Sequence, residues 1–252
     1  MDDRFSLQLF SVRNELKKNF KFTLRSVAEM GYTGVEFAGD YGGMSAPELR
    51  ALLDELGLTC VGAHVSLELL ENDFDAQADY LETLGCPHIV CPWAYIHDEA
   101  SAKEHGAKFE EIAVKCAMRG FRFSYHNHDH EFAKTEDGRY LDDVMMDSCS
   151  ELVMAELDVF WIAMAGADPV RVIRQYPGRM ELLHLKQMGW KDGEKVSVLF
   201  GQGVLDLADL SAHGKLMGIT DLIVEEETPC DDMLDAVRQD IEDLRRMEVS
   251  AE

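Results

Sequence analysis

Histidine and carboxylate side chains stand at the ends of several short apolar runs in this chain. The residues of metal-ligand type at these ends are His64, His126, His128, Glu156, Asp158, His184 and Glu225. Imidazole nitrogens and carboxylate oxygens are the usual protein ligands of divalent metals. A lone histidine in an apolar run is more often a hydrogen-bonded core residue, but its recurrence at the same position of several runs favours a metal site.

The runs that carry these residues alternate with amphipathic helical patterns. We predict eight strands, at Phe5–Phe10, Gly34–Ala38, Thr59–His64, His88–Cys91, Phe121–His126, Leu152–Asp158, Glu181–Lys186 and Asp221–Glu225. We predict helices at Leu16–Met30, Ala46–Leu56, Phe74–Leu84, Ala100–Arg119, Asp168–Tyr176, Asp206–Met217 and Met233–Met247, with a weaker pattern at Leu141–Ser148. Eight strand-helix units in 252 residues are typical of a (β/α)8 TIM barrel, so we expect a single α/β domain over residues 1–252.

An open, doubly wound sheet is the alternative to a closed barrel. Such a sheet normally carries a glycine-rich phosphate loop after its first strand, and the letters QLFSVR at 8–13 do not match one. The longest piece outside the repeating pattern is 187–203, which contains a turn at Asp192 and Gly193. On a barrel we expect this piece to overhang the active face and act as a lid.

The alternation of side chains along a strand predicts which residues share a face. Residues two apart point the same way, which groups Glu156 with Asp158, His184 with Lys186, and His126 with His128. The inward face of a closed barrel is packed with apolar side chains and opens to solvent only at its rim. An isolated charge in the lower layers would cost several kcal/mol. We therefore expect these polar side chains to meet at the C-terminal rim.

The composition limits the possible partners. The chain has 48 acidic and 24 basic residues, a formal net charge of -24, and no run of Lys or Arg longer than a pair. Such a balance repels phosphate backbones, so we expect no nucleic-acid partner. No apolar stretch approaches the length of a membrane span and no signal peptide is evident, so we expect no membrane partner and a cytoplasmic location. The six cysteines form no CxxC pair and are expected to be free thiols.

Six segments of the chain resemble the sugar phosphate isomerase/epimerase family. They are LQLFSVR at 7–13, GVEFAG at 34–39, YHNHDHEF at 125–132, ELDVFW at 156–161, LHLKQM at 183–188 and IVEEE at 223–227. This is the xylose-isomerase-like barrel group, which includes inosose isomerases and dehydratases, ketose 3-epimerases and apurinic endonucleases. The resemblance covers residues 5 to 245 and is specific for the family, not for the reaction.

The resemblance implies one divalent cation, most often manganese, with Mg²⁺, Co²⁺ or Zn²⁺ as alternatives. The family's ligands are Glu, Asp, His and Glu at the ends of strands five to eight, and the last three match Asp158, His184 and Glu225. The first Glu position falls on His126, which departs from the family pattern. An imidazole there makes the site less negative and favours softer transition metals. His128 and Glu131 stay open as alternative first ligands.

The chemistry that such a site favours is proton abstraction next to a carbonyl, through a metal-stabilised enediolate. The resemblance implies that Glu225 serves as both ligand and base. We expect Lys186 to act as an acid or to stabilise the oxyanion; the alternative is an ion pair with Glu156 or another rim carboxylate. Glu156 is a further candidate catalytic residue. The candidate substrate binders are His64, Glu36, Trp93, Trp161 and His128.

These observations favour an isomerase or epimerase that acts on a keto sugar or cyclitol. The closest alternative is a lyase or hydrolase that eliminates a substituent from a 3-oxo-glycoside, because the first proton transfer is the same. An endonuclease-type phosphodiesterase would need more metal ligands and a basic surface, which the net charge of -24 disfavours. A non-catalytic sugar-binding protein is a third class. A homo-oligomer, or pairing with a second barrel subunit, stays open.

We predict a preference for uncharged substrates. The rim carries Glu156, Asp158, Glu225, Glu226 and Glu227 and no cluster of arginines that would hold a phosphate. A neutral ketose should therefore react with a kcat/KM about tenfold above that of its phosphate, a difference of ~1.4 kcal/mol. Steady-state kinetics on both forms of one ketose check this, and faster turnover of the phosphate would reveal a phosphate site in the rim loops.

Overall fold

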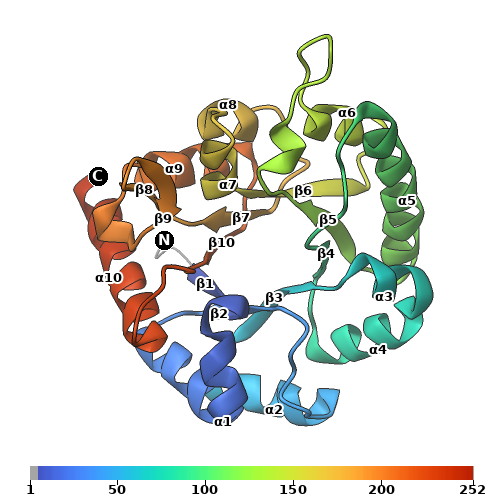
Figure 1. Cartoon of the computed structure of the whole chain (residues 1–252). Coiled ribbons are helices and arrows are strands. Elements are labelled where there is room, and N and C mark those ends of the chain that lie inside the picture. The colour runs from blue at the N-terminus through green and yellow to red at the C-terminus, as the bar shows by residue number, and fades with distance from the viewer. Residues whose placement is uncertain (1–4, 252) are drawn as a thin grey trace.

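The computed structural model describes residues 5–251, with side chains described as far as residue 247. Eight parallel strands close into a barrel in the order β1-β10-β7-β6-β5-β4-β3-β2, and helices surround it, as the view along the barrel in Figure 1 shows. The predicted (β/α)8 TIM barrel is confirmed. The predicted domain ends at residues 1 and 252 lie outside the described residues.

Every predicted strand is present, and most are shorter by a residue or two at one end. The barrel strands are β1 Phe5–Gln8, β2 Gly34–Phe37, β3 Thr59–His64, β4 His88–Cys91, β5 Arg122–His126, β6 Val153–Asp158, β7 Leu182–Leu185 and β10 Asp221–Val224. Each is a β-rich apolar run that is buried almost throughout, as expected for parallel strands covered by helices.

The helices also follow the predicted pattern, with two additions. They are α1 Arg13–Met30, α2 Ala46–Leu56, α3 Leu67–Asn72, α4 Phe74–Leu84, α5 Glu99–Met118, α6 Leu141–Asp147, α7 Val159–Met164, α8 Pro169–Ile173, α9 Leu207–Met217 and α10 Met233–Ala251. The sequence patterns did not predict α3 and α7, which have six residues each and are too short to show a helical period. Helix α8 covers only the first part of the predicted Asp168–Tyr176.

The register of neighbouring strands places predicted site residues side by side. His126 pairs with Glu156, Asp158 pairs with His184, and Gln8 pairs with Glu36. Glu156 also pairs with Leu182, which forms a small buried apolar cluster with Ile223, Val61 and Val90. Asp158 therefore occupies the last inward position of β6, and Glu156 occupies the inward position before it.

The segment after β7 forms a two-stranded hairpin, not a loop across the barrel mouth. Strands β8 Met188–Lys191 and β9 Glu194–Ser197 pair antiparallel around Asp192 and Gly193, which both have positive φ. This is the Asp-Gly turn that suits a tight hairpin. Lys195 donates to the carbonyl oxygen of Ala163 at 2.7 Å, so the hairpin packs beside α7. None of its residues lines the pocket described below.

Two further expectations concern the thiols and the membrane. The six cysteines are all free, and Cys60, Cys86, Cys91 and Cys116 are buried. Among the described residues, no helix combines the length and the apolar character needed to cross a bilayer.

Gln187 fastens the hairpin segment to the barrel. Its Oε1 accepts hydrogen bonds from the backbone nitrogens of Met188 and Leu205, both at 2.9 Å, and its Nε2 donates to the carbonyl oxygen of Leu205 at 3.0 Å. The side chain is buried, and a Cβ on Gly203 would collide with it. The side-chain amide of Gln187 thus forms hydrogen bonds with the backbone on both sides of the hairpin, at Met188 and at Leu205.

We predict that Gln187→Leu destabilises the protein by about 2–3 kcal/mol, because it leaves buried backbone groups unpaired at nearly constant side-chain size. Urea unfolding measures this loss, and hydrogen exchange should become faster in 188–205. Gln175→Leu is the matched control, since Gln175 is exposed and makes one hydrogen bond, at 3.4 Å. Equal stability of the two variants would contradict the role assigned to Gln187.

Candidate active site

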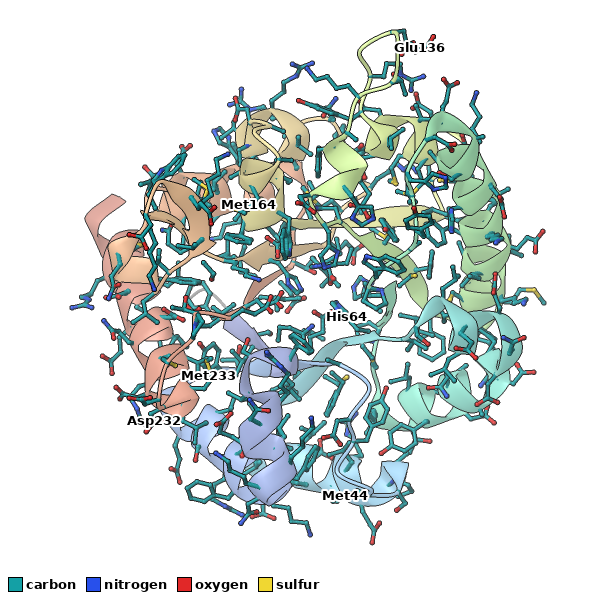
Figure 2. All side chains as sticks on the ribbon, viewed as in Figure 1. Met44, His64, Glu136, Met164, Asp232 and Met233 are labelled. Atoms are coloured by element: carbon teal, nitrogen blue, oxygen red, sulfur yellow. The ribbon has the colours of Figure 1, made fainter. Side chains whose placement is uncertain are left out.

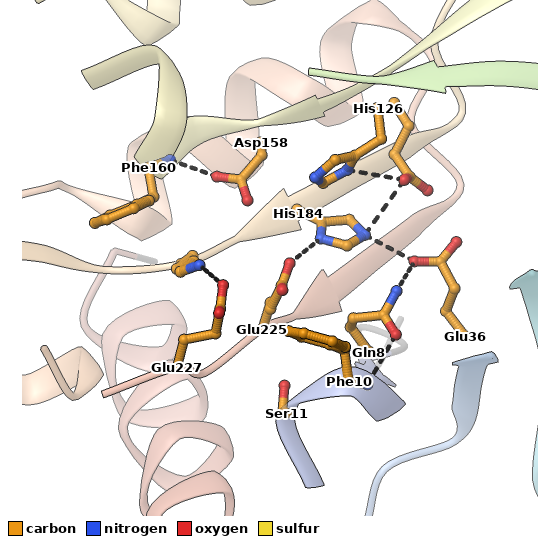
Figure 3. A network of polar contacts seen from close by, with 12 residues as sticks. Gln8, Phe10, Ser11, Glu36, His126, Asp158, Phe160, His184, Glu225 and Glu227 are labelled. Atoms are coloured by element: carbon orange, nitrogen blue, oxygen red, sulfur yellow. Dashed lines mark hydrogen bonds and ion pairs between the residues drawn. The ribbon is translucent and has the colours of Figure 1, made fainter. Parts of the chain in front are cut away.

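Four predicted ligands come together at the C-terminal rim. The ligand atoms of His126, Asp158, His184 and Glu225 all lie within 4.8 Å of one another, and all four residues are buried. They come from β5, β6, β7 and the residue after β10, so the arrangement of neighbouring strands brings their side chains together. Figure 3 shows the side chains of Asp158, His126 and Glu225 around the ring of His184. Neither His128 nor Glu131, the alternative first ligands, belongs to this group.

Asp158 carries the strongest sign that a cation fits here. Its Oδ1 accepts hydrogen bonds from the backbone nitrogens of Phe160, at 2.8 Å, and Trp161, at 3.2 Å, and so caps α7. Its Oδ2 is buried and has no hydrogen-bond partner in the described part of the chain. Burial raises the pKa of Asp158 to about 7, against the lowering effect of Lys186. A buried carboxylate oxygen without a donor is costly, and a divalent cation would compensate it.

The two histidine ligands are each oriented by carboxylates. His184 Nδ1 lies 2.8 Å from Glu225 Oε2, and its Nε2 lies 2.8 Å from Glu36 Oε2. His126 Nδ1 lies 3.0 Å from Glu156 Oε2. An imidazole that donates from one nitrogen to a carboxylate offers the other nitrogen to a metal, and the contact fixes the ring orientation. Glu36 is thus placed to orient the ring of His184, and Glu156 is placed to orient the ring of His126.

His64 links these two carboxylates. Its Nε2 lies 2.8 Å from Glu156 Oε2 and 3.2 Å from Glu36 Oε2. Burial lowers the pKa of His64, but the two carboxylates outweigh burial and raise it to about 10. Burial together with the charge of Glu36 raises the pKa of Glu156 to about 7. His64, His126, Glu156 and His184 form a second group whose ligand atoms are within 4.8 Å of one another.

A pocket of about 530 Å³ opens above this cluster. Its lining includes four of the five predicted substrate binders, namely His64, Trp93, Trp161 and His128, together with Glu225. Glu36 and the predicted catalytic residues Glu156 and Lys186 are buried and are not among the lining residues. In Figure 2 His64, one of the lining residues, lies near the centre of the ring of helices.

Lys186 is paired with a rim carboxylate other than Glu156. Its Nζ donates to Glu227 Oε1, and it also lies 4.7 Å from the ring centroid of Phe160 and 5.0 Å from that of Trp161. Burial lowers the pKa of Lys186, but the charges of Glu225, Asp158 and Glu227 outweigh burial and raise it. Lys186 is therefore a buried cation next to the ligand group, and its partner Glu227 lines the pocket.

Glu131 has a supporting position. Its carboxylate accepts hydrogen bonds from the hydroxyl of Tyr125 and, at 2.9 Å, from the backbone nitrogen of His128. It thereby fixes the turn that presents His128 to the pocket. Burial and the neighbouring His126 lower the pKa of His128 to about 3, so its ring is neutral at physiological pH.

The sequence patterns missed several residues of the site. Gln8 donates to Glu36 Oε2 at 2.8 Å and lines the pocket; its place at the end of β1 was the available signal. Glu227, which the sequence analysis placed at the rim, also lines the pocket. Phe10, Tyr41 and Leu69 also line it, but they lie beyond the strand ends, where no periodic pattern marks them.

Comparisons with known proteins agree with this architecture. A sequence model of the family described as xylose isomerase-like TIM barrel matches residues 24–247. An inosose dehydratase from Geobacillus kaustophilus (strain HTA426) is 25% identical over 190 residues, which are 66% of this chain and 61% of the relative. The chain thus spans about three fifths of the length of that relative.

Two solved structures share the fold. The crystal structure of a sugar phosphate isomerase/epimerase from Parabacteroides distasonis superposes with a TM-score of 0.84 at 25% identity, covering 97% of this chain and 98% of that one. The crystal structure of the IOLI protein with a binding zinc atom has a TM-score of 0.78 at 13% identity and covers 98% of each chain.

We predict that protein purified without chelator contains about one divalent metal ion per chain, since the two candidate ligand groups share His126 and His184 and could not both be filled. Asp158→Asn keeps an oxygen that can cap α7 and removes the charge, so it should lose most of the metal without unfolding. His184→Ala should lose metal as well. Elemental analysis and a thermal melt of each variant check this.

Asp147→Ala and His97→Ala are the matched controls, because both residues are exposed and lie outside the ligand group. They should retain the metal content of the unmodified chain. Full metal content in both Asp158→Asn and His184→Ala would show that the ion lies elsewhere.

Proposed function

Because the chain belongs to the xylose isomerase-like TIM barrel family, we propose that it is a divalent-metal-dependent isomerase or epimerase of a neutral keto sugar or cyclitol. The observation that carries the proposal is the ligand group with the unpaired, buried Asp158 Oδ2 beneath a pocket of about 530 Å³. The proposed ligands are His126, Asp158, His184 and Glu225, and manganese is the proposed metal.

A divalent cation at these ligands would act as a Lewis acid on the negative charge that develops on a substrate oxygen when a neighbouring C–H proton leaves. Glu225 is the proposed base, because it reaches the pocket while it contacts His184. Burial raises the pKa of Glu225, but Lys186 and His184 outweigh burial and hold it far below the ordinary value. The carboxylate is therefore ionised at neutral pH, as a proton acceptor must be.

Lys186 supplies a fixed positive charge beside the reacting oxygen. Its side chain is almost fully buried and makes contacts with Glu227, Phe160 and Trp161 that hold it in place. A buried, oriented cation stabilises developing negative charge more strongly than an exposed one, because little water screens it. Glu156 and Glu36 orient the histidine ligands in this proposal, and a direct catalytic role of Glu156 stays a prediction.

The remaining polar residues of the pocket suit hydroxyl groups. His128 presents a neutral ring, and its Nδ1 is buried without a partner in the described part of the chain. His64 adds a second imidazole to the lining. Trp161 adds an aromatic face against which a sugar ring can pack, and Trp93, 51% exposed, adds a second face for the part of the substrate nearer the solvent.

The charge of the lining supports a neutral substrate. Among the described residues that line the pocket, none is Lys or Arg. Arg13, the main cation near a strand end, lies 3.9 Å over the ring of Phe10 and donates to its carbonyl oxygen at 2.6 Å. A phosphate in the pocket would thus face Glu225 and Glu227 without an arginine to bind it in bidentate fashion. The cytoplasmic location and the oligomeric state stay predictions from the sequence.

Elimination is the second candidate, and the likeness to an inosose dehydratase favours it. The same base would remove the proton, and a hydroxyl or glycosidic oxygen two carbons from the carbonyl would then leave. Incubation of the Mn²⁺-supplemented protein in deuterated water with ketoses and with 3-oxo-glycosides separates the two. Deuterium uptake with carbon skeleton and substituents intact supports isomerisation, and release of the substituent supports elimination. Failure of both reactions with every sugar would contradict the proposed function.

We predict that Lys186→Met lowers kcat by about 10²-fold or more and leaves metal content unchanged, because Met retains the packing of the stem and removes the charge. Lys191→Met is the control, since Lys191 is exposed on the hairpin, and it should retain full activity. Stopped assays with the substrate identified by deuterium exchange measure kcat for both variants, and elemental analysis measures their metal content. Unchanged kinetics in Lys186→Met would reduce Lys186 to an ion pair with Glu227.

A further inference from the structure

The pocket changes character from its floor to its mouth. Gln8, His126 and Glu225 are buried at the strand ends and form a polar floor. The residues that follow those ends are apolar and much more exposed: Phe10 is 39% exposed, Leu69 40% and Trp93 51%. Exposed apolar side chains are usually scattered over a surface, whereas these three line one opening. Together with Tyr41, Val65 and Pro92 they form what we call the apolar mouth.

The apolar mouth is held in shape by contacts outside the pocket. The guanidinium group of Arg13 covers one face of the Phe10 ring at 3.9 Å. Tyr41 packs on Tyr80 with ring centroids 4.6 Å apart. The loop that carries Trp93 is fixed at Ala94, the next residue. Ala94 is buried, and its backbone nitrogen donates a hydrogen bond to the Tyr125 hydroxyl at 3.2 Å. A preformed apolar surface costs little conformational entropy when a ligand binds.

Two polar side chains of the lining, Ser66 and Gln77, lie near these apolar residues. Ser66 Oγ accepts from the backbone nitrogen of Leu69 at 3.4 Å, and Gln77 Nε2 donates to Asp73 at 3.4 Å. A bare sugar carries hydroxyl groups around its whole ring, and those turned toward Phe10, Leu69 and Trp93 would lose water against apolar side chains. The floor therefore suits a hydroxylated ring, and the mouth suits a flat group without hydroxyls.

We propose that the substrate is a keto sugar that carries an aryl group, such as a 3-oxo aryl glycoside, whose aromatic group binds in the apolar mouth while the ring with the carbonyl lies on the polar floor. This inference rests on the proposed function for the reacting ring and adds the class of its substituent. Aromatic groups bury a large apolar area and prefer offset or edge-to-face contacts with other rings, which Phe10, Tyr41 and Trp93 offer. The open side of the mouth leaves room for substituents on the aryl group.

Binding of three glucosides to the Mn²⁺-supplemented protein tests the proposal without any turnover. Phenyl β-glucoside should bind about tenfold more tightly than methyl β-glucoside by titration calorimetry, because only the phenyl group buries apolar area in the mouth. It should also bind more tightly than cellobiose, in which a second sugar replaces the aryl group. Equal affinity for the phenyl and methyl compounds, cellobiose binding as tightly as the phenyl compound, or no saturable phenyl binding would each overturn the proposal.

A pair of variants locates the aryl group. Leu69→Asn changes a side chain that is 40% exposed on α3, so the fold should persist, and it should reduce the phenyl-to-methyl affinity ratio several-fold. Trp93→Ser, in a loop, should do the same. Leu216→Asn on α9, where the leucine is 74% exposed and outside the pocket, is the matched control and should leave the ratio unchanged.

An unchanged ratio in both Leu69→Asn and Trp93→Ser would overturn the assignment of the aryl group to the mouth. The failure of the proposed chemistry has a different signature. It would appear as absent deuterium exchange and elimination with every sugar, while the phenyl preference and its loss in the two variants persisted.

Discussion

Burial of negative charge at one end of the barrel is the constraint on which the site depends. Glu36, Glu156, Asp158 and Glu225 are all withdrawn from solvent within one cluster. Carboxylates in such a medium are stable only when cations or hydrogen-bond donors face them. Three histidines and Lys186 face these carboxylates, yet one oxygen each of Glu36, Glu156 and Asp158 is buried without a hydrogen-bond partner in the described part of the chain. A divalent cation would compensate this unpaired negative charge. The same charges hold the imidazole rings in orientation.

Backbone geometry makes this concentration of charge possible. In-register parallel strands place His126 beside Glu156 and Asp158 beside His184, while the apolar layer below keeps water out. Gly62 shows how tightly the cluster is packed, because a Cβ at this position would collide with the Glu36 carboxylate. The site is thus a property of strand register and of small residues around it, and the loops above are free to determine which molecule enters.

The sequence predicted the barrel and most of the cluster because both follow from local patterns. Apolar β-rich runs ended by His, Asp or Glu give the strand positions, and alternation gives the shared face. Pairings that depend on rotamers and on distant elements were beyond it: Lys186 contacts Glu227 and not Glu156, and Glu131 serves Tyr125 and His128. The sequence patterns also did not predict the short helices α3 and α7 or the position of the hairpin beside α7, because tertiary packing determines these features.

Asp158 joins two parts of the molecule through one rigid carboxyl group. One oxygen holds the first turn of α7 and the other faces the ligand cluster. Any ion that draws on the second oxygen therefore also restrains the first turn of the helix that carries Trp161, a wall of the pocket. By thermodynamic linkage the effect is reciprocal. In the proposed enzyme, a sugar that packs against Trp161 would therefore tighten the hold on such an ion, and the two ligands would bind with positive cooperativity across a single side chain.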